Sequence, residues 1–154
     1  MGYSKQAVGM VLGLCTATAA FALPNEHFQG KPEFKAGDDL GAFVWHDEAG
    51  QHVRFTTKGV IPHKFSGKIC GESVSDLHPH ELEAADSANV GPEGHCVVFE
   101  MHVDGGVDGF DFRVAGDVVR YEFHQDGGAM GAALIRIGAQ SHHPADGSFV
   151  LNRK

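Results

Sequence analysis

From Gly41 onward, apolar and polar residues alternate with a period of two, and this pattern restricts the fold more than any other feature. Successive side chains of a β-strand point to opposite faces of its sheet, so alternation is typical of a strand with one buried face. The alternating runs lie at residues 43–46, 52–55, 63–69, 97–104, 110–114, 119–124, 135–137 and 149–151. Roughly seven or eight short strands predict an all-β antiparallel sandwich of jelly-roll or immunoglobulin-like type, with a partly closed barrel as the alternative.

The first two runs predict a β-hairpin around the turn Asp47-Glu48-Ala49-Gly50-Gln51. A type I turn with Gly50 in the left-handed conformation would pair Asp47 with Gln51 and leave a three-residue loop. The same register would set His46 opposite His52. It would also place four apolar side chains on one face: Phe43, Trp45, Val53 and Phe55.

Residues 76–94 interrupt the alternation. Pro79 precedes a segment that allows a helix of one or two turns over residues 80–88, which is too short to be stable alone. We therefore expect a surface crossover here.

The first 22 residues predict a cleaved export signal. Lys5 precedes a largely apolar run that ends in Ala20-Phe21-Ala22, the small-x-small pattern that signal peptidase accepts. A membrane anchor needs about 20 unbroken apolar residues, and this run is shorter and contains Gly and Thr. A lipoprotein would use Cys15, but the bulky Leu14 precedes it.

The organisation that follows is a signal peptide at residues 1–22, a loosely ordered arm at 23–40 and a single β-sandwich domain at 41–154. The arm contains Pro24 and Pro32 and shows little periodicity. We expect the mature protein in the periplasm or outside the cell, with no membrane insertion after the signal is removed.

Charge and cysteine content restrict the partners and the compartment. The chain has 12 Lys and Arg against 20 Asp and Glu, a net charge of −8, which argues against nucleic acid or an anionic membrane as partner. Removing the signal leaves Cys70 and Cys96, which predict one structural disulfide in an oxidising compartment. The alternative, a redox-active or metal-binding thiolate pair, lacks a Cys-x-x-Cys spacing.

Several segments between Gly41 and Leu151 carry a resemblance to other proteins: residues 43–47, 50–57, 63–67, 105–112 and 137–138, followed by His143-Pro144 and Phe149. On these segments the chain resembles a group of uncharacterised secreted bacterial proteins with a small β-domain. The resemblance implies an exported β-domain and no catalytic residue.

Eleven histidines suggest a site for a transition metal, Zn or Cu, because neutral imidazole is a common ligand of both. The first candidate is His46 with His52, opposed across the predicted hairpin. His102 and His124 fall on outward positions, near Glu100, Asp104 and Glu122. Further candidates are His78, His80 and Glu81, and His142 and His143 with Asp146. The alternative is that these are solvated faces and loops, since Zn or Cu needs three or four converging ligands.

Two other patterns allow a functional and a structural interpretation. Residues 104–111 contain three Asp and three Gly, which suit either a calcium loop or a Gly-rich hairpin turn; the turn is favoured because the remaining ligands of a calcium motif are missing. Trp45 and Tyr121 would suit a sugar-binding platform, but their parity favours the core.

No pattern in the sequence points to catalysis. The serines lie outside any nucleophile elbow, and no Gly-rich loop precedes a helix. We expect an exported non-catalytic binding or surface-interaction module for a protein or glycan ligand. The alternatives are a His-rich metal-binding protein and a small secreted hydrolase.

Overall fold

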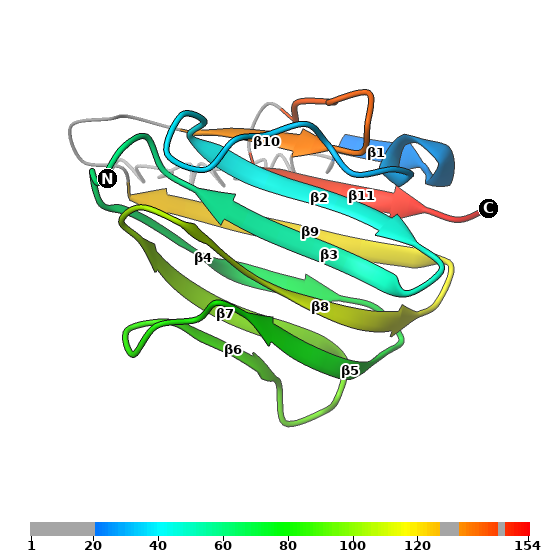
Figure 1. Ribbon diagram of the computed structural model, residues 1–154. Helices are drawn as coiled ribbons and strands as arrows, with labels where there is room; N and C mark the ends of the chain where they lie inside the picture. Colours follow the sequence, from blue (N-terminus) through cyan, green and yellow to red (C-terminus); the bar gives the residue numbers. More distant parts are fainter. Residues whose placement is uncertain (1–20, 127–132, 145–146) are drawn as a thin grey trace, which may run out of the picture.

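The computed structural model describes residues 21–126, 133–144 and 147–154, and its two packed β-sheets confirm the predicted sandwich. The six-stranded sheet A has the order β1 (Phe21–Pro24), β11 (Ser148–Asn152), β9 (Val118–Asp126), β4 (His63–Cys70), β7 (Cys96–Val103) and β6 (Ser87–Val90). The five-stranded sheet B has the order β10 (Leu134–Ile137), β2 (Gly41–Asp47), β3 (Gly50–Thr56), β8 (Val107–Ala115) and β5 (Ser73–His80). Figure 1 shows sheet B in front of sheet A.

The sheets are mixed rather than purely antiparallel. At one edge of each sheet a short strand pairs in parallel, β1 with β11 and β10 with β2, while the other pairs are antiparallel. The described ranges contain eleven strands, more than the alternation predicts, and the additional strands β1, β5 and β6 all lie at sheet edges. No helix in these ranges is long and apolar enough to cross a membrane.

Aromatic side chains fill the space between the sheets. Phe55 contacts Phe65, Phe99, Phe110 and Phe123, with ring centroids 4.9–6.4 Å apart. A second group at one end of the sandwich consists of Phe28, Tyr121 and Phe149. Truncating one of these buried rings to Ala should cost about 3–5 kcal/mol, because the cavity left behind fills only partly.

The predicted register of the β2–β3 hairpin is wrong by one residue. Asp47 pairs with Gly50 instead of Gln51, so the loop has two residues, and Trp45 instead of His46 lies opposite His52. The Asp47 carboxylate accepts a hydrogen bond from the Ala49 amide at 2.8 Å, which closes this tighter turn. His46 and His52 consequently lie on opposite faces of sheet B.

The alternation does not reveal the true register of this hairpin, because β2 is buried on both faces. Ala42 and Val44 belong to the core between the sheets, whereas Phe43 and Trp45 are equally inaccessible on the other face. There Phe34 stacks on Phe43 at 4.2 Å, and Lys31 lies 5.7 Å from the Trp45 ring. Apolar residues on both faces remove the information that alternation carries.

Residues 23–28 have regular structure, in contrast to the loosely ordered arm predicted for residues 23–40, whereas residues 29–40 contain no helix or strand. Residues 23–28 begin inside β1 and continue into the 3-10 turn η1 (Asn25–Phe28). Leu23 and Phe28 are 4% and 0% exposed and belong to the core. The two apolar side chains, spaced too irregularly for a periodic pattern, fix this segment against both sheets.

Residues 76–94 contain the expected surface crossover, but without the short helix that the sequence allows. Much of the segment is strand, in β5 and β6, and residues 81–86 cross from sheet B to sheet A without helix. The Asp86 carboxylate accepts hydrogen bonds from the amides of Glu83, at 2.8 Å, and His102, at 2.7 Å, which holds a turn here. Pro79 is compatible with β5 because that strand lies at the edge of its sheet.

The predicted disulfide is confirmed. Cys70 in β4 and Cys96 in β7 face each other in the antiparallel register and are bonded.

Residues 104–106, in the segment considered for calcium, form the turn that carries the chain from β7 in sheet A to β8 in sheet B.

Candidate functional site

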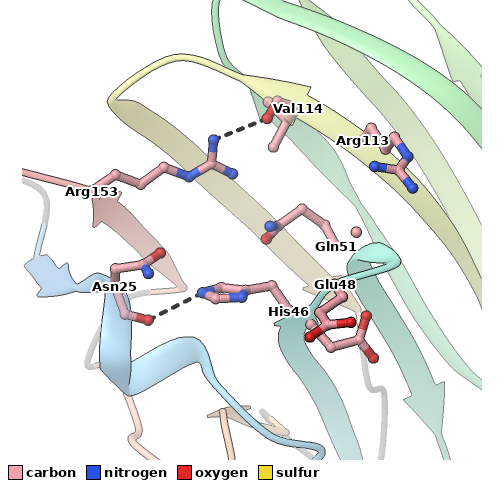
Figure 2. A pocket seen from close by; sticks show the side chains of 9 residues that line it. Asn25, His46, Glu48, Gln51, Arg113, Val114 and Arg153 are labelled. Atoms are coloured by element: carbon pink, nitrogen blue, oxygen red, sulfur yellow. Dashed lines mark hydrogen bonds between the residues drawn. The ribbon is translucent and has the colours of Figure 1, made fainter.

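A polar pocket lies at the end of the sandwich formed by the β2–β3 turn. It has a volume of about 340 Å³ and is called the end pocket below. Figure 2 shows around it side chains from sheet B, Asn25 from η1, and Arg153, which directly follows β11 of sheet A. The lining residues are Asn25, His46, Asp47, Glu48, Gly50, Gln51, Arg113, Val114 and Arg153.

His46 enters the pocket because it has the same parity in β2 as the core residues Ala42 and Val44. Its Nε2 lies 3.2 Å from the carbonyl oxygen of Asn25 and donates to it, which leaves Nδ1 as an acceptor. Burial lowers the pKa of His46 below 6.5, an effect opposed by the Asn25 carbonyl and reinforced by the charge of Arg153. The ring is therefore neutral at pH 7.

Gln51 presents a fixed amide at the inner end of the pocket. The side chain is 3% exposed, and its Oε1 accepts a hydrogen bond of 2.7 Å from the Tyr121 hydroxyl. Burial raises the pKa of Tyr121, so the hydroxyl keeps its proton and remains the donor. This bond joins sheet B to sheet A and sets the orientation of the amide.

Arg153 supplies the positive charge of the pocket. Its Nη1 donates to the carbonyl oxygens of Val114, at 3.0 Å, and Gly116, at 3.1 Å. Its backbone amide donates to the Asp117 carbonyl at 2.8 Å. Within the described residues no carboxylate lies within 4.0 Å of this guanidinium, and no partner is present for its Nε and Nη2 protons. Arg153 is thus held in place by backbone groups with its charge unneutralised.

The acidic side of the pocket comes from the hairpin turn. Asp47 is already engaged, because it accepts hydrogen bonds from Ala49 and from Nε2 of His52, and the His52 bond lowers the pKa of Asp47. Glu48 is exposed and has no ion-pair or hydrogen-bond partner in the described part of the chain. The other arginine of the lining, Arg113, lies 3.4 Å from Asp76 and is already paired.

His52 belongs to a separate network on the outer face of sheet B. It stacks on Trp45 at 4.9 Å, and its Nδ1 lies 2.7 Å from Asp111. Arg54 also bonds Asp111, at 3.0 Å, and its guanidinium lies over the Trp45 ring. Because its groups bond one another, this network is better suited to fixing the strands than to holding a ligand.

His102 and His124 both lie on the outer face of sheet A, as predicted, but they are not brought together. They occupy β7 and β9, and β4 runs between these two strands. His102 donates from Nδ1 to the Ala85 carbonyl at 2.9 Å, while Nε2 of His124 lies 2.9 Å from Glu122. Each histidine therefore has its own local partner.

The other histidine candidates are also dispersed. His78 and His80 lie on edge strand β5, and His142 stacks on His27 with ring centroids 4.1 Å apart. Asp146 falls outside the described residues. Among the residues that are described, no group of three or more His, Cys, Asp or Glu is arranged to hold a metal ion.

Sequence patterns identified His46, as a candidate metal ligand, and Tyr121, as a core residue, but missed Asn25, Gln51 and Arg153. Gln51 was assigned to the turn, and Asn25 and Arg153 lie outside the strongly alternating part of the chain. No local signal could have joined them, because the pocket depends on the packing of both sheets and η1.

Comparison with family models, curated proteins and solved structures finds no match for this chain.

Proposed function

We propose that this protein is an exported, non-catalytic binding module that holds a small carboxylate-bearing molecule in the end pocket. The observation that carries the proposal is Arg153, a positioned guanidinium with unneutralised charge at the pocket. Guanidinium groups bind carboxylates through paired, charge-assisted hydrogen bonds, and the free Nε and Nη2 protons offer such a pair.

The neighbours of Arg153 support a binding role. Gln51 and the neutral His46 are held by hydrogen bonds before any ligand arrives, which reduces the ordering cost of binding. The volume of about 340 Å³ lies at the lower end of the range for small-molecule sites.

Export is supported by the Cys70–Cys96 disulfide, because such bonds persist mainly outside the reducing cytosol. A glycan ligand has less support. Trp45 and Tyr121, the side chains suited to a sugar platform, are 6% and 2% exposed and offer no free ring face.

The test is calorimetric titration of the mature, oxidised protein with propanoate and with its neutral isostere propanamide. We expect propanoate to bind at least ten times more tightly, since a hydrogen bond to a charged group contributes about 1.5–3 kcal/mol. Arg153→Gln should abolish this preference, whereas Arg120→Gln, on the outer face of sheet A, should leave it unchanged.

Arg153 also bonds two backbone carbonyls, so its replacement could disturb the fold. Gln51→Glu provides a second variant that preserves shape and can still accept the Tyr121 bond. Its added carboxylate beside the pocket should repel propanoate. Equal binding of propanoate and propanamide to the wild-type protein would overturn the proposal.

A further inference from the structure

The end pocket holds two unmatched charges of opposite sign, and we infer that its ligand is a small zwitterion that carries an ammonium as well as a carboxylate group, as an α-amino acid does. This inference rests on the proposed function and specifies its ligand class. Arg153 would take the carboxylate and Glu48 the ammonium.

The first step is that neither charge is satisfied within the protein. Of the four charged residues in the lining, two already have partners: Asp47 bonds His52, and Arg113 pairs with Asp76. Arg153 and Glu48 have no ion pair within the described residues, either with each other or with a third group. Both charges are therefore open to a ligand.

The second step is the arrangement of the two charges. Figure 2 shows Arg153 and Glu48 on different sides of the pocket, with Gln51 and His46 between them. The intervening groups are neutral, because burial keeps the pKa of His46 low and Gln51 carries an amide. The pocket thus has a positive end, a neutral polar middle and a negative end.

The third step separates a zwitterion from a simple anion. Glu48 belongs to the same pocket lining as Arg153, so a plain carboxylate bound at Arg153 shares the pocket with a like charge, which weakens its binding. An ammonium on the same molecule would turn that repulsion into attraction. Discrimination would then come from both a favourable contact for the zwitterion and an unfavourable one for the plain anion.

The experiment compares L-alanine with the two molecules that lack one of its charged groups: propanoate, which lacks the ammonium, and ethylamine, which lacks the carboxylate. Affinities for the mature, oxidised protein are measured at pH 7 by NMR titration, which also detects millimolar binding. We expect L-alanine to bind at least ten times more tightly than propanoate, and ethylamine to bind most weakly because it lacks the group that Arg153 anchors.

Glu48→Gln is the decisive variant, since an exposed turn residue should be replaceable without loss of the fold. It should reduce the preference for L-alanine over propanoate from at least tenfold to less than twofold. Glu93→Gln removes an exposed carboxylate from a different turn and should leave the preference intact.

The outcomes distinguish the two proposals. If propanoate binds through Arg153 as tightly as L-alanine does, and Glu48→Gln changes neither affinity, the zwitterion inference is overturned while the carboxylate site stands. If neither L-alanine nor propanoate binds the wild-type protein, both proposals are overturned. The same holds if both molecules bind the Arg153→Gln variant as tightly as they bind the wild type.

Discussion

Replacing Asp108 with asparagine is expected to stabilise the protein at neutral and alkaline pH. Asp108 follows Val107 in β8, shares the core-facing parity of Phe110, and is 8% exposed with no hydrogen-bond partner in the described part of the chain. Burial raises the pKa of this carboxyl group from 3.8 to about 7, and four surrounding carboxylates add to the effect: Asp86, Glu83, Asp104 and Glu81.

The magnitude follows from the shift in pKa. Each unit corresponds to about 1.4 kcal/mol, so a rise from 3.8 to about 7 amounts to roughly 4 kcal/mol. The folded-state pKa lies above the unfolded-state pKa, so between pH 4 and 7 the unfolded chain releases this proton while the folded protein retains it. Stability is therefore lost as the pH rises through this window, and Asp108→Asn removes the loss.

The assay is urea unfolding from pH 3 to pH 8, followed by the fluorescence of Trp45, the single tryptophan of the chain. The difference in unfolding free energy between the variant and the wild type should grow with pH and level off above pH 7, with a total change of about 4 kcal/mol. Asp126→Asn, at an exposed position of β9, serves as the control. A difference that does not vary with pH would refute the reasoning.

Three further predictions concern bonds described above. Tyr121→Phe should lower the free energy of unfolding by about 1 kcal/mol in urea titrations and should weaken propanoate binding, because it frees the amide of Gln51; unchanged stability would contradict the bond between the sheets. Replacing Cys70 and Cys96 by Ala should cost about 3 kcal/mol, and dithiothreitol should lower the wild type to the same level; equal stability with and without the disulfide would contradict this. The ring protons of His46 should titrate by NMR with a midpoint below 6.5, so that stability from its neutral form is lost as the pH falls below that value; a midpoint above 6.5 would mean that the ring is not desolvated.

Sequence patterns predicted the architecture well where each strand has one buried face. The alternation in β4, β7 and β9 matches the structure: Phe65, Phe99 and Phe123 point into the core, while Glu100 and Glu122 form ion pairs on the outer face. The disulfide was predictable as well, because the expected removal of a signal peptide would leave only Cys70 and Cys96 to pair.

The same reasoning failed where both faces of a strand are covered. Phe34 packs on Phe43, and Lys31, His52 and Arg54 lie against Trp45; this packing cannot be read from local periodicity. The resulting register error placed His46 opposite His52 and so predicted that the two share a metal ion. In the structure their side chains lie on opposite faces of sheet B. Arg153 belongs to no sequence pattern, since its position depends on the carbonyls of Val114 in β8 and Gly116 in the following turn, which lie far away in the sequence.

The most direct test of the proposed carboxylate site in the end pocket is a titration of the isotope-labelled mature protein with propanoate, followed by two-dimensional NMR. The account predicts that the largest shifts occur at the side-chain amide of Gln51, the Nε proton of Arg153 and the ring of His46, with none at His102 or His124. Shifts confined to the outer face of sheet A, or no shifts at the end pocket up to saturating propanoate, would contradict it.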